Sequence, residues 1–162
     1  MRKTAVFLGA AALVFSASQL TAQAPSFAGA WTMVVDPAAA PPAGGRGGRG
    51  GLGQAATIVQ DAKTLTVTRT TQAGEVKSVY NLDGTDSKNT MSFGGNSVEQ
   101  TSKTKWDAGK LVITTSSSFN GNAFETTMVL SLDAAGNLIV DSTSPGRGGG
   151  APTTTKTTYK KS

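Results

Sequence analysis

The sequence contains no cysteine and no histidine, and these two absences narrow what the protein can be. Without cysteine no disulfide can form, so the fold depends on packing and hydrogen bonding alone. Without histidine the chain lacks the commonest general base, the histidine dyads of many hydrolases and the commonest ligand of transition metals. We therefore expect no catalytic residue, no metal site and no cofactor, and we interpret the protein as non-enzymatic.

Long apolar runs are also scarce, and the one that is present lies at the start of the chain. Residues 1–3 carry the basic pair Arg2 and Lys3, residues 5–15 are all apolar or small, and Ala22 and Ala24 flank Gln23 in a small-x-small pattern. An apolar run of this length is shorter than the roughly 20 residues that a membrane-spanning helix needs. We interpret residues 1–24 as a secretory signal peptide cleaved near Ala24, with export to the periplasm or out of the cell and no membrane span.

The remaining residues, 25–162, are enough for a single domain with one modest core. Loss of Arg2 and Lys3 with the leader lowers the formal net charge from +5 to +3. So small a surplus makes no strong case for nucleic acid as a partner. The sequence does not fix an oligomeric state.

Apolar and polar residues alternate with period two from Phe27 onward, which is typical of half-buried β-strands. Short segments rich in Asp, Asn and Gly, such as "WDAGK" and "LDAAGN", separate the runs and suit tight hairpins. We predict an all-β, antiparallel up-and-down β-barrel of about ten strands, because closure removes exposed sheet edges. An eight-stranded lipocalin-like barrel and a β-sandwich are the alternatives. The expected strands are 27–35, 55–60, 63–71, 75–82, 89–93, 97–106, 110–119, 123–132, 137–143 and 153–161.

Both ends of this region resemble the calycin superfamily, which comprises the lipocalins and fatty-acid-binding proteins. Phe27, Gly29 and Trp31 match the Phe-x-Gly-x-Trp opening of that superfamily, and Tyr159 with Lys161 resembles the Tyr-x-Lys end of the fatty-acid-binding branch. More broadly, the chain resembles small exported lipocalin-like proteins of bacteria. The resemblance implies that Gly29 lets the first strand bend and that Trp31 plugs the closed end of the barrel.

Two segments rich in glycine and arginine, residues 37–53 and 144–151, interrupt the strand pattern. Residues 44–53 contain seven glycines and two arginines, and the second segment reads "SPGRGGG". If ten strands form a barrel, both segments connect strands at the same rim, so that Arg46, Arg49 and Arg147 would gather at the mouth. Three interpretations stay open: flexible spacers, a cationic rim that attracts anionic or amphipathic ligands, and a weak site for single-stranded nucleic acid.

Polar residues also fall on the faces predicted to point into the barrel. The expected ligand-binding side chains of the interior are Arg69, Tyr80, Gln100, Ser102, Thr115 and Tyr159. Buried polar groups need partners. They either satisfy one another and water or line a cavity for a polar ligand, and Arg69 could meet a ligand carboxylate.

We therefore hypothesise an exported lipocalin-like protein that binds a small amphipathic or anionic ligand in its barrel. The alternative is a structural or interaction protein of the cell envelope, with a filled barrel and cationic loops that contact acidic polymers. A carboxylate-dependent enzyme is a third, weaker hypothesis, because the acidic residues are scattered through the predicted turns and outer faces.

Overall fold

The computed structural model describes residues 24–35, 51–71, 74–93, 96–119, 121–146 and 150–162. Within these ranges the chain forms ten strands, and no helix there is long and apolar enough to cross a membrane. The strands are β1 (Gly29–Met33), β2 (Ala55–Gln60), β3 (Thr64–Thr71), β4 (Gly74–Asn81), β5 (Ser87–Phe93), β6 (Asn96–Asp107), β7 (Lys110–Phe119), β8 (Asn122–Leu132), β9 (Leu138–Ser144) and β10 (Thr153–Lys161).

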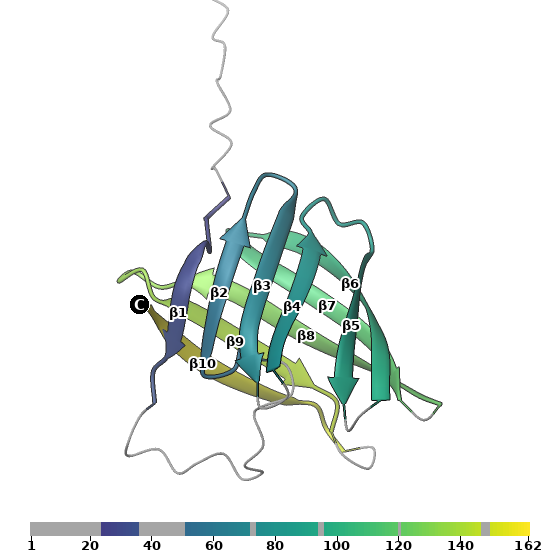
Figure 1. Ribbon diagram of the computed structural model, residues 1–162. Helices are drawn as coiled ribbons and strands as arrows, with labels where there is room; N and C mark the ends of the chain where they lie inside the picture. The colour runs from purple at the N-terminus through teal and green to yellow at the C-terminus, as the bar shows by residue number, and fades with distance from the viewer. Residues whose placement is uncertain (1–23, 36–50, 72–73, 94–95, 120, 147–149) are drawn as a thin grey trace, which may run out of the picture.

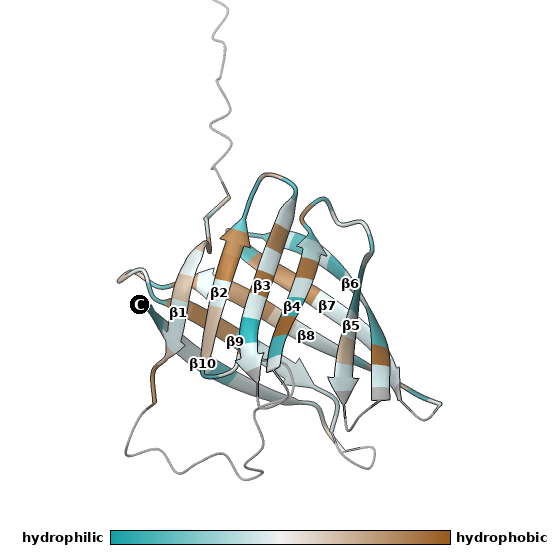
Figure 2. Cartoon of the chain, in the orientation of Figure 1, coloured by the Kyte–Doolittle hydropathy of each residue, from teal (hydrophilic) through white to brown (hydrophobic). Residues whose placement is uncertain are grey.

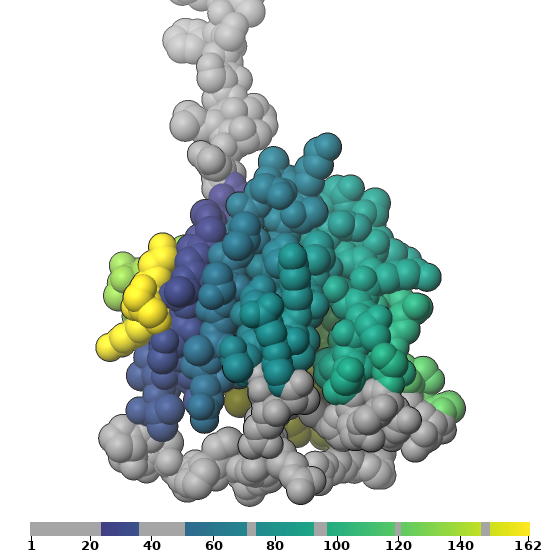
Figure 3. All heavy atoms as spheres, viewed as in Figure 1, coloured from purple at the N-terminus to yellow at the C-terminus, as the bar shows by residue number. Residues whose placement is uncertain are grey.

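All ten strands belong to one antiparallel sheet that curls into a nearly closed barrel (Figure 1). Each strand pairs with its sequence neighbours except at one place, and β10 pairs with β1, so the two ends of the chain meet in the sheet. The yellow C-terminal residues accordingly lie beside the purple first strand in the space-filling view (Figure 3). This confirms the predicted ten-stranded up-and-down barrel over the eight-stranded barrel and the sandwich.

The exception is the seam between β4 and β5, which are the two edges of the sheet. Side chains bridge this seam in place of a backbone ladder. The amide of Asn89 on β5 accepts from the backbone N–H of Val79 at 2.8 Å and donates to its carbonyl at 2.9 Å. Ser87 Oγ accepts from the N–H of Asn81, and the Thr104 hydroxyl donates to the carbonyl of Asn81. The polar groups of these edge residues are thus satisfied without a further strand.

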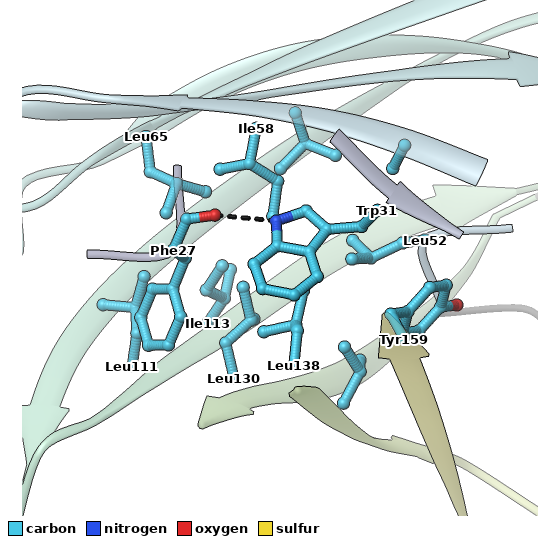
Figure 4. Packing of buried hydrophobic residues seen from close by; sticks show 13 residues of the cluster. Phe27, Trp31, Leu52, Ile58, Leu65, Leu111, Ile113, Leu130, Leu138 and Tyr159 are labelled. Atoms are coloured by element: carbon cyan, nitrogen blue, oxygen red, sulfur yellow. Dashed lines mark hydrogen bonds between the residues drawn. The ribbon is translucent and has the colours of Figure 1, made fainter. Parts of the chain in front are cut away.

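The core fills the space inside the sheet because alternate residues of each strand point inward. Hydrophobic and polar colours accordingly alternate along β3 and β4 (Figure 2). Figure 4 shows the buried side chains meeting from opposite walls of the barrel. The fully buried members with the largest side chains are Trp31, Tyr159, Phe27, Leu52, Ile58, Leu65, Leu111, Ile113, Leu130, Leu138 and Val140.

The two ends of the barrel differ in their connections. At the end where β1 begins, here called the closed end, short described turns join β2 to β3, β4 to β5, β6 to β7 and β8 to β9. Asp61 and Asp133 each accept backbone N–H groups within their turns, and Asp83 does so from Thr85. Side-chain hydrogen bonds from Thr85 to Asp83 and from Asn137 to Asp133 add to these backbone bonds. The side-chain bonds are the main cause for Asp83 and Asp133, and the backbone bonds for Asp61, of a carboxyl pKa below its ordinary value of 3.8. At the opposite end, here called the mouth, β1 and β9 end and β2 and β10 begin.

Candidate functional site: the barrel interior

The closed end of the interior is an apolar floor built around the predicted plug, Trp31. This side chain is 2% exposed, and its indole N–H donates to the carbonyl of Phe27 at 2.9 Å (Figure 4). Phe27 in turn stacks on Trp106, with ring centroids 6.0 Å apart and an angle of 10° between the rings. The amide of Gln60 holds this segment by accepting from the N–H of Phe27 and donating to the carbonyl of Pro25. The floor is therefore closed by the chain that precedes β1.

The opening and closing sequence patterns contact each other across the β1–β10 pair. Trp31 is the register partner of Lys161, whose ammonium nitrogen lies 5.6 Å from the centre of a Trp31 ring. Gly29 adopts a φ of +146°, and a Cβ there would lie 2.7 Å from Cε of Lys161. Both a rare backbone conformation and a close neighbour thus favour glycine at this position. The roles that the calycin resemblance implies for Gly29 and Trp31 stay predictions.

A polar wall lies on β6 and β7, where the sequence predicted it. Ser102 is buried and shares a hydrogen bond of 2.8 Å with the hydroxyl of Thr115. Gln100 is half-buried and donates from Nε2 to the hydroxyl of Ser117 at 3.1 Å. Among the described residues, no buried side-chain nitrogen or oxygen lacks a hydrogen-bond partner. The four side chains therefore satisfy one another in the present conformation.

Arg69 on β3 introduces a positive charge into the other wall of the barrel. It shares the inward face of β3 with the buried residues Leu65 and Val67, and its own side chain is half-buried. Its Nη1 donates to the backbone carbonyl of Gly51 at 3.0 Å. The ion pairs found in the described part of the chain, Lys88–Glu99 and Lys103–Asp86, join exposed side chains and do not involve this guanidinium.

Two tyrosines lie within electrostatic reach of Arg69. Burial raises the pKa of the Tyr80 hydroxyl above its ordinary value of 10.0, and the Arg69 charge and a hydrogen bond with Ser78 oppose that rise. Burial also raises the pKa of Tyr159, opposed by its backbone hydrogen bonding and again by Arg69. Both phenols are therefore neutral hydrogen-bond donors near neutral pH. Arg69 therefore acts electrostatically on both phenols, and the role of these three side chains in a ligand site stays a prediction.

Residues 51–54, here called the strap, occupy the space between Arg69 and Tyr159. Besides the Arg69–Gly51 bond, the hydroxyl of Tyr159 donates to the carbonyl of Gly53 at 2.9 Å. The backbone N–H of Met33 donates to the carbonyl of Gln54 at 2.8 Å. Leu52 is only 1% exposed and lies between Trp31 and Tyr159 (Figure 4). The expectation placed all of 37–53 in a loop at the mouth, but the end of this segment belongs to the core.

Sequence reasoning had not assigned a role to Leu52, although one signal was available. Leu52 is the only large apolar residue of the sequence segment 36–54, which otherwise consists of polar and small residues. A lone leucine among glycines has little reason to stay in water when a barrel opening lies beside it. Asn89, which bridges the seam, was missed for a different reason, because only the tertiary structure places two sheet edges face to face. Arg46, Arg49 and Arg147 lie outside the described residues.

The described acidic residues do not converge on the interior. They occupy turns at the closed end or outward positions of the strands, and most are exposed. No group of three or more Asp or Glu residues that could hold a metal ion occurs in the part of the chain that the structure describes.

The described residues form a hollow at the closed end of the barrel and another on the outer face of the sheet. One, of about 420 Å³, adjoins the closed end and is lined by Ser26, Gln60, Asp61, Leu82 and Trp106 among others. The second, of about 190 Å³, lies on the outer face of β1 to β3 beside Thr57, Thr68 and Glu75. Neither of these two hollows is lined by Arg69, Tyr80 or Tyr159.

No protein-family model matches the chain, and comparison with curated proteins finds no match either. The class of the protein is therefore described from its fold and from the side chains of its interior. It is a ten-stranded antiparallel up-and-down β-barrel with an apolar floor, a hydroxyl-rich wall and a guanidinium near its mouth.

Proposed function

We propose that the chain is an exported, non-enzymatic, lipocalin-like binding protein that holds a small amphipathic or anionic ligand in its barrel. The observation that carries the proposal is the environment of Arg69. Its half-buried side chain lies on an inward face, and the hydrogen bond from its Nη1 is accepted by a backbone carbonyl, not by a carboxylate. A charge removed from water is costly unless it is paired and fully hydrogen-bonded. An anionic ligand group would supply that partner, and the apolar floor would accept the rest of the ligand.

The calycin resemblance supports this proposal through residues at both ends of the chain. The Gly29–Trp31 opening and the Tyr159–Lys161 ending contact each other and help to close the barrel. The leader-like residues 1–24 support export. The scattered carboxylates and the absence of histidine support a binding role over a catalytic one.

Native mass spectrometry of the protein purified gently from its host tests the proposal. We expect a stoichiometric adduct whose mass identifies a small amphipathic or anionic molecule. Arg69→Gln should lose most of the adduct, because the neutral amide cannot pair with an anion. Lys105→Gln is a matched control, since Lys105 is an exposed cation on the outward parity of β6. An adduct-free protein that also fails to bind carboxylates added in solution would contradict the proposal.

One set of contacts favours a second function, that of a structural or interaction protein of the envelope with a filled barrel. Leu52 already fills space beside Trp31, and the polar wall satisfies itself. In this case the cationic segments, not the interior, would contact an acidic polymer. A protein that retains no small molecule but binds an acidic polysaccharide in a salt-dependent way would support this second function.

A further inference from the structure

We infer that the strap is an internal occupant of the ligand site and that a compact amphipathic carboxylate displaces it. The inference rests on the proposed binding function and adds the position of the site, the class of its ligand and the way in which the site opens. In this arrangement the Leu52 side chain occupies the place of the ligand's apolar part, and the carbonyls of Gly51 and Gly53 occupy the place of its carboxylate.

The contacts of the strap have the chemistry of a bound amphipathic molecule. Its one large side chain, Leu52, is buried against the rings of Trp31 and Tyr159. Its carbonyl oxygens accept from a guanidinium at 3.0 Å and from a phenol at 2.9 Å. A carboxylate attached to an apolar chain presents the same two features, an oxygen acceptor pair and an apolar group, in one small molecule.

A carboxylate would also be the stronger partner for these donors. A hydrogen bond with an ionised donor or acceptor is roughly twice as strong as a neutral one, so a carboxylate would strengthen the bond from Tyr159. Arginine can in addition bind a carboxylate through two parallel bonds and so gain a counter-charge. The strap presents only neutral carbonyl oxygens to Arg69 and Tyr159. Exchange of Gly51 and Gly53 for a carboxylate therefore satisfies the guanidinium charge, which the strap leaves without a counter-charge.

The strap is built so that it can leave without disturbing the barrel wall. Residues 51–53 lie outside the strands, and Gly53 is two residues before the start of β2. Gly53 has a φ of +79°, and no atom lies within 4 Å of the position that a Cβ would take. Rotation at this glycine would withdraw Leu52 while the Met33–Gln54 bond keeps β2 in register. The pairing of β1 with β2 and β10 does not involve residues 51–53.

The test uses octanoate as the probe and 1-octanol as its uncharged counterpart, with binding to the purified chain measured by calorimetry. We expect the wild type to prefer octanoate, and Arg69→Gln to lose about tenfold or more of that preference with the loss of charged hydrogen bonds. Leu52→Ala should tighten octanoate binding by about tenfold, because it weakens the internal competitor. Leu111→Ala removes the same atoms from an equally buried position in the floor and should not tighten it.

A second measurement follows the strap directly in the wild type and does not depend on how well any variant folds. Nuclear Overhauser contacts between the Leu52 methyls and the rings of Trp31 and Tyr159 should weaken as octanoate is added. Contacts between Leu130 and its neighbours in the floor serve as the reference.

The outcomes separate this inference from the proposed function. Octanoate binding with unchanged Leu52 contacts would overturn the inference and leave the binding function standing. Equal tightening by Leu52→Ala and Leu111→Ala would also overturn it, since any added space would then suffice. Binding by Leu52→Ala alone would support it and would mean that the strap excludes this probe from the wild type. If neither protein binds octanoate the inference fails, and the adduct found by mass spectrometry decides the function independently.

Discussion

Gly29 and Trp31 show how single residues join the two ends of the chain. Trp31 fills the core, and its register partner on β10 is Lys161, whose ammonium lies over the indole ring. Gly29 permits this approach because it has a positive φ and no side chain opposite Lys161. The calycin resemblance implied a bend at the glycine, and the structure places this glycine directly beside the Lys161 side chain of the last strand.

Gly29→Ala should therefore lower the free energy of unfolding by about 1 to 2 kcal/mol, because an L-residue is strained at this φ. Equilibrium denaturation in urea measures the change. The double variant Gly29→Ala/Lys161→Ala separates two causes. If the backbone is the cause, removing the Lys161 side chain restores little of the loss. Full restoration would assign the effect to the contact with Cε, and an unchanged free energy in the single variant would contradict both explanations.

At the scale of elements, the barrel closes in two different ways. The β1–β10 junction is a backbone ladder, whereas the β4–β5 junction uses the side chains of Asn89, Ser87 and Thr104. The amide of Asn89 substitutes for a paired residue because it offers one acceptor and one donor to Val79. Two sheet edges, which would otherwise invite pairing with another chain, are thereby brought together within the molecule.

Asn89→Leu should open this seam locally. It removes both partners of the Val79 backbone, and we expect a loss of about 1 to 3 kcal/mol from two net hydrogen bonds. Hydrogen exchange gives the sharper readout, since the Val79 amide should exchange faster. The Tyr80 amide faces β3 by the alternation of an antiparallel strand and should keep its protection. Equal acceleration at both amides would indicate global destabilisation and would contradict a local role for Asn89.

At the scale of the whole molecule, the described groups with a shifted pKa are of two kinds: carboxyls in the turns and phenols in the interior. The pKa values of Asp61, Asp83 and Asp133 lie below 3.8 in the folded state, and those of Tyr80 and Tyr159 lie above 10.0. With no histidine and no cysteine, the chain has no side chain that ordinarily titrates between these two groups. The interior and the turns therefore respond to opposite extremes of pH.

We expect the free energy of unfolding to be nearly constant from about pH 5 to about pH 9. Below the ordinary carboxyl pKa the unfolded chain takes up protons first, so stability falls as the pH drops through the lowered values of the folded state. Above the ordinary phenol pKa the unfolded chain releases protons first, so stability falls as the pH rises toward the raised values. Urea denaturation across this range measures the profile, and Tyr80→Phe should reduce the alkaline fall. A step in stability between pH 5 and pH 9 would contradict the prediction.

The fold was largely predictable from the sequence because its information is local. Period-two alternation and Asx-type turns predicted ten strands, and the observed bounds differ from the predicted ones by a few residues at most. β1 is shorter than expected and ends at Met33, while β5 begins earlier, at Ser87, because its backbone pairs with β6 from that residue onward. The inward parity of Arg69, Tyr80 and Ser102 likewise followed from alternation, since side chains on one strand face point the same way.

The sequence by itself determined the strand order, the inward faces and the lack of histidine and cysteine chemistry, because each depends on residue type and on spacing along the chain. Only the tertiary structure decided that Leu52 leaves its glycine-rich surroundings for the core and that Arg69 and Tyr159 bind the carbonyls beside it. It also decided how β4 meets β5. These contacts join residues from 6 to 106 positions apart. No local pattern encodes such pairs, and they form only once the closed sheet brings its walls within hydrogen-bonding distance.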